Sequence, residues 1–174
     1  MTDINPQSLA ALQKVAMGAL HEKATEITVY LSCLGGSTDA GFTAYHFLRS
    51  LPVPLTMHCI GNVESMGIII YLAADTRIAS PHSKFKIHPM QWNFPASAVD
   101  HDRLNEFSQS IDFDADRYAS IYEERIKDAK NPIDVRDVLA TKARIFGATT
   151  AIDAGLTTAI ADAEIPATAV RWWV

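Results

Sequence analysis

The alternation of strand-like and helical apolar runs between residues 27 and 87 limits the possible folds more than any other feature of the chain. In the strand-like runs apolar and polar residues alternate, whereas in the helical runs apolar residues recur every three or four positions. Strands are predicted at 27–32, 55–60, 76–79 and 85–87, and helices at 38–49 and 65–74. This order predicts an α/β fold with a parallel sheet and right-handed crossovers.

The rest of the chain is predicted to be mainly helical. An amphipathic helix is expected over residues 6–23, and a short helix, a strand and a last helix over 133–139, 144–146 and 148–154. Residues 98–130 predict one long helix with a break near 112–114. No internal repeat or interdomain linker is visible, so residues 1–174 are predicted to form a single domain from which the long helix projects as a handle.

The composition argues against several classes of function. A net charge of −5 over 174 residues does not favour nucleic acid as a partner. The longest apolar run, around residues 66–74, is too short to cross a membrane. The first six residues lack the basic and apolar regions of a secretory signal, so we expect a cytoplasmic protein. Neither metal-ligand spacing nor a nucleotide-binding glycine pattern occurs, and no cofactor is predicted.

The segment 61–67 places a serine, Ser65, between a predicted strand and a predicted helix. A sharp turn at this position exposes the hydroxyl and directs the first N–H groups of the helix to the same point. A second turn at Gly35 and Gly36 could supply another N–H donor, and His88, after a strand, could take the hydroxyl proton. Together these residues predict a serine hydrolase site.

Structural roles are also open to these residues. A serine that begins a helix often caps it by accepting a hydrogen bond from a backbone N–H group, and a histidine at a strand end often bonds a backbone carbonyl. The other histidines have no matched nucleophile in the sequence and are expected to be surface or strand-end residues. They are His21, His46, His58, His82 and His101.

Three motifs resemble, in order and spacing, the proteolytic subunit of the ATP-dependent Clp protease. They are Leu34-Gly35-Gly36-Ser37, the segment 61–67 ending in Ser65-Met66-Gly67, and Lys86-Ile87-His88-Pro89. Residues 147–156 are similar to the last helix and turn of that family, and the match extends from about residue 6 to 160. The resemblance implies a Clp/crotonase-type spiral of ββα units with a protruding handle helix.

The resemblance also implies roles for individual residues. Ser65 would be the nucleophile and His88 the general base, while the N–H groups of Gly36 and Met66 would form the oxyanion hole. The segment after Gly36 would pair with an extended peptide. The substrate would be a peptide or an unfolded protein, cleaved within a homo-oligomeric ring of six or seven subunits, or within two stacked rings.

The sequence departs from the family at several positions. The family's third catalytic residue is an aspartate, where Ala143 stands here; Asp134 or Asp137 could replace it, although both are more typical of residues that cap a short helix. Glu64 precedes the serine where a small residue is usual, and its charge would oppose an oxyanion unless it points to solvent.

The N-terminus is a further departure. The chain begins just before the first predicted helix, without the family's first strand and axial-gate segment, which argues against docking to a Clp ATPase.

These departures leave two other functions open. The chain could be a degenerate Clp paralogue that assembles with an active subunit as a scaffold or regulator. It could also be a crotonase-type acyl-CoA enzyme, which polarises a thioester carbonyl, but the register of Ser65 with His88 and the lack of a basic cluster argue against that activity.

Overall fold

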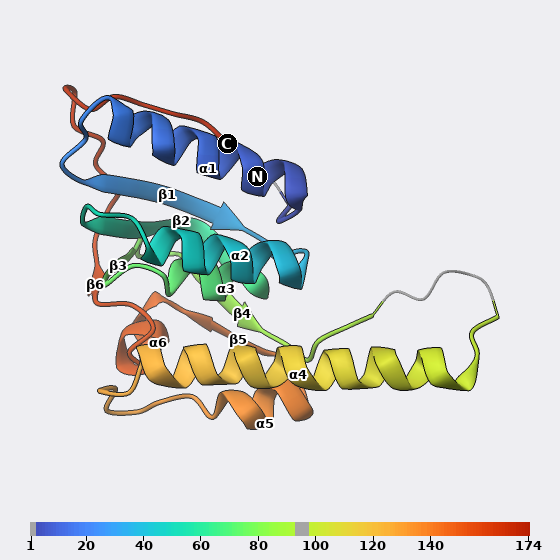
Figure 1. The fold of residues 1–174 in the computed structure, drawn as a ribbon. Helices are drawn as coiled ribbons and strands as arrows, with labels where there is room; N and C mark the ends of the chain where they lie inside the picture. The colour runs from blue at the N-terminus through green and yellow to red at the C-terminus, as the bar shows by residue number, and fades with distance from the viewer. Residues whose placement is uncertain (1–2, 93–97) are drawn as a thin grey trace.

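A six-stranded sheet organises the computed structural model, which describes residues 3–92 and 98–174 (Figure 1). The strands are β1 (Ile27–Cys33), β2 (Leu55–Glu64), β3 (Thr76–Ala79), β4 (Lys84–Ile87), β5 (Arg144–Gly147) and β6 (Ala159–Ile160). The order is β5-β4-β2-β3-β6, and β1 pairs with the other edge of β2. Among the described strands only β5 is antiparallel to its neighbour, so the predicted parallel sheet is confirmed for β1 to β4, and β6 adds a further parallel strand.

Six helices surround this sheet in the described residues. They are α1 (Pro6–His21), α2 (Thr38–Arg49), α3 (Met66–Tyr71), α4 (His101–Arg125), α5 (Val135–Ala140) and α6 (Ala148–Asp153). Local sequence explains where several of them begin. Asn5 and Ser8 form a reciprocal capping box at α1, and the side chains of Ser37 and Asp100 accept N–H groups at the starts of α2 and α4.

The core lies where β2 and α3 meet. Met57, Cys59 and Val63 of β2 are fully buried, and every residue of α3 is buried. A large apolar side chain buried to this extent stabilises the fold by about 1.5–3 kcal/mol. The strand and helix that flank Ser65 are therefore among the most tightly packed parts of the molecule.

Strand β2 is longer than the sequence indicates. The predicted strand ends at residue 60, but β2 continues to Glu64 because its last residues pair in parallel with β4. Gly61 permits this continuation, since a Cβ atom there would lie 2.8 Å from the hydroxyl oxygen of Ser32 on β1. The turn predicted over 61–67 is thus confined to Ser65.

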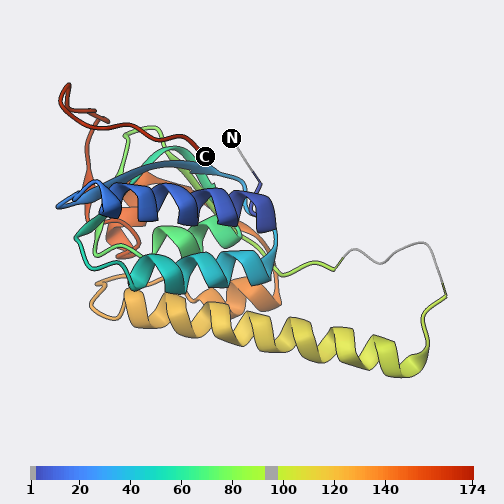
Figure 2. The same cartoon turned by 45° about the horizontal axis from the view of Figure 1, so that its top comes forward.

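The handle helix is confirmed, but two details of the prediction are wrong. α4 is one continuous helix without the break expected near 112–114, because no glycine or proline interrupts residues 101–125. It ends at Arg125 rather than near 130. The next residue, the buried Ile126, turns the chain towards α6. Between 101 and 110 only Phe107 is even half-buried, and this half extends beyond the other elements (Figures 1 and 2).

The C-terminal segment after β6 returns over the first helix (Figure 2). The indole ring of Trp172 packs against Gly18 of α1, where a Cβ atom would lie 3.6 Å from the ring. Neither this segment nor β6 is predicted by the sequence pattern. Within residues 3–92 and 98–174, no helix combines the length and the apolar character needed to cross a membrane.

Candidate active site

The predicted site residues follow the carboxyl ends of three neighbouring parallel strands. Cys33, the last residue of β1, pairs with Val63 of β2, and Glu64, the last residue of β2, pairs with Lys86 of β4. The loops after parallel strands emerge at the same edge of a sheet. The Gly35 turn, Ser65 and His88 therefore share one edge of the molecule.

Ser65 has a backbone conformation that few residues other than glycine adopt. Its φ is 53° and its ψ is −129°, and its N–H group donates to the carbonyl oxygen of Lys86 at 2.8 Å. Although Ser65 precedes α3, its side chain makes no capping hydrogen bond. The hydroxyl of Ser65 therefore does not perform the capping role that the sequence left open. Strain of this kind at a strand-to-helix turn is typical of a nucleophile held at the tip of a turn.

The glycine turn packs directly on this serine. Gly35 has a φ of 104°, and a Cβ atom on it would lie 2.6 Å from the Cβ atom of Ser65 and 3.1 Å from its hydroxyl oxygen. Only glycine permits this approach. The turn is held from the other side by Ile4, which donates its N–H to the carbonyl of Gly35 at 2.9 Å and accepts the N–H of Ser37 at 2.8 Å.

Two backbone N–H groups remain available beside the serine. The bonds made by Ile4 leave the N–H group of Gly36 without an acceptor among the described residues. Met66 is the first residue of α3, so its N–H group has no acceptor within the helix. Gly36 and Met66 are the two residues predicted to supply oxyanion donors.

His88 follows β4 and is half-buried. Its Nδ1 atom lies 2.7 Å from the carbonyl oxygen of Pro89. When Nδ1–H donates to this carbonyl, Nε2 keeps the lone pair that a general base needs. The described residues show no hydrogen bond between Ser65 and His88, and in enzymes without substrate this bond is often long or poorly aligned.

Among the described residues no carboxylate forms a hydrogen bond or an ion pair with His88. The antiparallel register of β4 with β5 ends at the pair of Ile87 with Arg144, and extending it by one residue would set His88 opposite Ala143. Ala143 is exposed. Nδ1 of His88 lies instead beside the carbonyl oxygen of Pro89, as in the carbonyl-bonded role considered for this histidine.

The two aspartates considered as replacements make other contacts. Asp134 caps α5 by accepting the N–H of Asp137 at 3.0 Å, and both residues are exposed. Among the described residues neither carboxylate contacts His88. The helix-capping role expected for Asp134 is confirmed.

Glu64 neither points to solvent nor carries an unbalanced charge. The residue is 8% exposed, and its Oε1 lies 2.7 Å from Nζ of Lys84 on the neighbouring strand. The solvent-facing orientation considered for Glu64 is therefore not the one observed, and its charge is balanced by the lysine instead. The sequence pattern does not predict this partner, since Lys84 lies at a strand start twenty residues away.

Four of the remaining histidines lie at the surface as predicted, but the prediction is wrong for His58, which is buried within β2. His21, His46, His82 and His101 are exposed, while His58 is buried with Nε2 3.2 Å from both the carbonyl of Ala161 and the hydroxyl of Ser80. In the part of the chain that the structure describes, no cluster of His, Cys, Asp and Glu could hold a metal ion.

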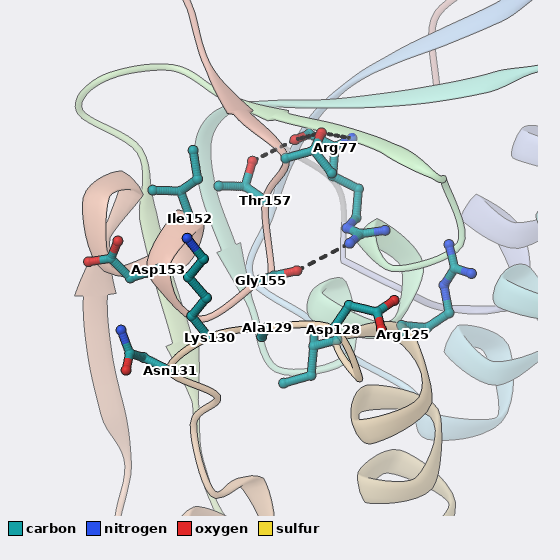
Figure 3. Close-up of a pocket in the computed structure, with 12 residues that line it drawn as sticks. Arg77, Arg125, Asp128, Ala129, Lys130, Asn131, Ile152, Asp153, Gly155 and Thr157 are labelled. Carbon is teal, nitrogen blue, oxygen red and sulfur yellow. Dashed lines mark hydrogen bonds between the residues drawn. The ribbon is translucent and has the colours of Figure 1, made fainter.

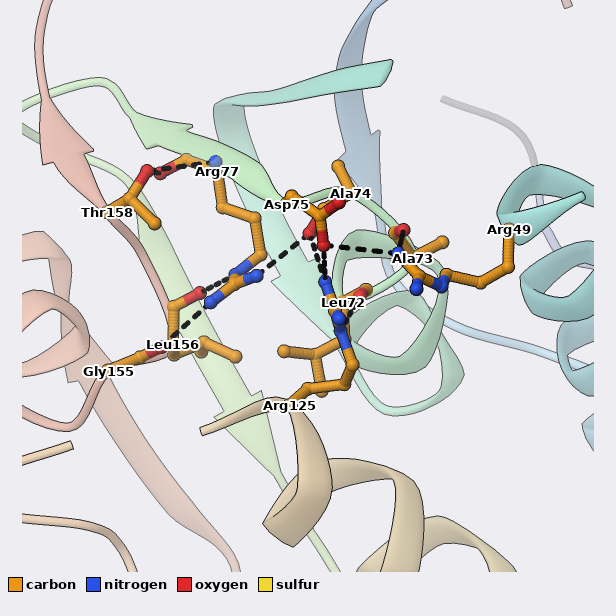
Figure 4. A network of polar contacts seen from close by, with 10 residues as sticks. All are labelled: Arg49, Leu72, Ala73, Ala74, Asp75, Arg77, Arg125, Gly155, Leu156 and Thr158. Carbon is orange, nitrogen blue, oxygen red and sulfur yellow. Dashed lines mark hydrogen bonds and ion pairs between the residues drawn. The ribbon is translucent and has the colours of Figure 1, made fainter. Parts of the chain in front are cut away.

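A separate cavity of about 440 Å³ opens at the opposite edge of the sheet, near the start of β3 (Figure 3). Its most buried cation is Arg77, which donates to the carbonyl oxygens of Leu156, Ala74 and Gly155 at 2.8, 2.8 and 3.2 Å. Arg125 donates to the carbonyls of Leu72 and Ala74 and to Asp75 (Figure 4). These guanidinium groups satisfy carbonyls at helix ends, which is a structural role.

The comparison with a protein-family model decides the relationship. The model described as Clp protease matches residues 4–164. The chain belongs to the Clp protease family. The membership suggested by the three motifs is therefore confirmed.

Known proteins of the Clp family extend this result. An ATP-dependent Clp protease proteolytic subunit from Deinococcus radiodurans is 34% identical over 77 residues, which are 43% of this chain and 38% of that protein. The match thus spans well under half the length of that relative. A mutant of ClpP1 from Listeria monocytogenes superposes with a TM-score of 0.76 at 20% identity, over 92% of this chain and 88% of the other. The predicted Clp-type α/β fold is confirmed.

Proposed function

We propose that this protein is a Clp-type serine endopeptidase in which Ser65 is the nucleophile and His88 the general base. The observation that carries the proposal is the conformation and packing of Ser65. Its hydroxyl makes no cap bond, its backbone is held at a φ of 53°, and the Gly35 turn packs against it. A purely structural serine would not need this conformation.

The geometry supports acyl transfer through a covalent intermediate. Nε2 of His88 takes the hydroxyl proton while the oxygen of Ser65 attacks the peptide carbonyl. The N–H groups of Gly36 and Met66 then stabilise the oxyanion, and each such donor lowers a barrier by about 2.7–4 kcal/mol. His88 returns the proton to the departing amine, and a water molecule, deprotonated in the same way, hydrolyses the acyl-enzyme.

The carbonyl of Pro89 performs part of the task of the missing aspartate. It fixes the tautomer and the orientation of His88, whose Nδ1 lies 2.7 Å away. As a neutral dipole it stabilises an imidazolium less than a carboxylate does. We therefore expect a functional but slow catalytic pair.

The proposed substrates are peptides or unfolded proteins, bound as an extended strand beside the segment after Gly36. We further propose that the subunits assemble into a ring, because the exposed first half of α4 buries almost nothing within its own chain. A cytoplasmic location is proposed with this function.

Labelling with a fluorophosphonate probe tests the proposal, because the probe reacts only with an activated serine. We expect one adduct on the wild-type protein, none on Ser65→Ala, and labelling slower by at least about a hundredfold on His88→Ala. Ser80→Ala is the matched control and should label like the wild type. An adduct that persists on Ser65→Ala would contradict the proposal.

Ala143 opposite His88 favours a second candidate function, a subunit without activity that assembles with an active Clp-type subunit as scaffold or regulator. Co-purification with such a subunit, together with no adduct on this chain, would favour this role over the first.

A further inference from the structure

The carbonyl group of Ser65 receives a hydrogen bond from the handle helix. The hydroxyl of Tyr118, on α4, donates to this oxygen at 3.2 Å. The same oxygen accepts the N–H of Ile68, within the first turn of α3, at 3.0 Å. A residue 53 positions away in the chain thus contacts the main chain of the proposed nucleophile.

The buried environment of Tyr118 keeps its hydroxyl protonated and able to donate a hydrogen bond. The residue is 2% exposed, and burial raises the pKa of its hydroxyl well above the ordinary value. The hydroxyl therefore stays protonated throughout the pH range in which a histidine base works. Hydrogen bonds are also stronger electrostatically in such a low-dielectric setting.

The oxygen that accepts this bond belongs to the same peptide unit as a proposed oxyanion donor. The carbonyl of Ser65 and the N–H of Met66 belong to the same planar peptide unit, so the direction of one fixes the direction of the other. Donation to the oxygen also polarises the amide and makes its N–H a better donor, as in any chain of hydrogen bonds. The hydroxyl therefore acts on the N–H that the proposed mechanism directs at the oxyanion.

We propose that Tyr118 is a positioning residue that orients and polarises the Ser65–Met66 amide for oxyanion stabilisation. The inference rests on the proposed peptidase function for its kinetic consequence, but not for its structural one. Sequence patterns alone assign Tyr118 only to the apolar stripe of the handle helix.

Tyr122 provides a matched control one helical turn further along α4. It is fully buried, and its hydroxyl has no hydrogen-bond partner among the described residues. Tyr118→Phe and Tyr122→Phe each remove one buried hydroxyl from the same face of the same helix. Only the first removes a bond to the Ser65–Met66 amide.

The kinetic experiment compares the two variants in the hydrolysis of a fluorogenic peptide. Tyr118→Phe is expected to lower kcat about three- to tenfold and to leave KM unchanged. This is the change in rate that corresponds to the net free energy of one hydrogen bond. Tyr122→Phe should stay within about twofold of the wild type. Equal losses in both variants, or a change confined to KM, would overturn the inference.

A second measurement separates failure of this inference from failure of the proposed function. The chain has five methionines, so selective ¹⁵N-methionine labelling gives few amide signals, and Met66→Leu assigns the one required. The Met66 amide proton should move upfield in Tyr118→Phe and stay in place in Tyr122→Phe. An unmoved signal in Tyr118→Phe overturns the inference, whereas a moved signal in a protein without peptidase activity overturns only the function.

Discussion

Main-chain groups, rather than charged side chains, hold the two proposed catalytic residues. Ser65 is bound through its N–H to β4 and through its carbonyl to Tyr118, and His88 is oriented by the carbonyl of Pro89. Backbone acceptors of this kind leave no mark in the sequence. The position of the serine could be predicted from its flanking glycines. A backbone carbonyl is one of the partners expected for the histidine, but the sequence could not indicate that Pro89 would supply it.

Ala143→Asp tests the arrangement around His88. A carboxylate opposite the histidine should compete for Nδ1 and stabilise the imidazolium in the transition state, which we expect to raise the rate constant of fluorophosphonate labelling about tenfold. Ala143→Asn has the same size without the charge and should change the rate less than threefold. A labelling rate in the aspartate variant no higher than that of the wild type would contradict this expectation.

At the scale of elements, local sequence patterns predict helices and strands well where local residues set their ends. They predict strands poorly where pairing with a distant strand extends them. α2 is predicted to the residue because Ser37 caps it and Pro52 soon follows. The extension of β2 past Gly61 depends instead on pairing with β4, which no local pattern reveals. β6, a strand of two residues, depends entirely on its contact with β3.

Arg77 joins several of these elements at the edge opposite the serine. Replacing it with methionine would leave the carbonyl oxygens of Leu156 and Gly155 without their donor around a site that is 6% exposed, while the carbonyl of Ala74 keeps its bond from Arg125. We therefore expect Arg77→Met to lower the free energy of unfolding by about 2–4 kcal/mol. Urea denaturation measures this change. Arg49→Met, which removes a largely exposed ion pair with Asp75, should cost at most about 1 kcal/mol. Similar losses in both variants would contradict the structural role of Arg77.

At the scale of the whole molecule, most side chains in the first half of α4 are exposed among the residues that the structure describes. Leu104 is 47% and Phe113 62% exposed on this helix. Single exposed apolar residues are common. An exposed half-helix that carries several of them, however, points to contact with another subunit.

Leu104→Glu combined with Phe113→Glu should weaken such an assembly. Two charges at a subunit contact would be desolvated without partners, and we expect the mass measured by light scattering to fall towards that of one chain, 19.1 kDa. Ser108→Glu together with Ser110→Glu adds the same charge at exposed polar positions of the same helix and serves as the control. A wild-type protein that already has the mass of one chain would contradict the assembly proposal.

Because α4 is one continuous helix, only some movements of the handle displace the Tyr118 hydroxyl that bonds the carbonyl of Ser65. Leu104 and Tyr118 are separated by about 21 Å along the helix axis, at 1.5 Å per residue. A tilt of about 5° around Tyr118 would displace Leu104 by about 2 Å and leave the tyrosine hydroxyl nearly still. A slide along the axis would instead reach the hydroxyl undiminished, because a helix without a break hardly compresses. In the proposed assembly a neighbouring subunit could therefore tilt the handle with little effect at Ser65, whereas pushing it lengthwise would move a hydrogen-bond donor of the proposed reaction centre.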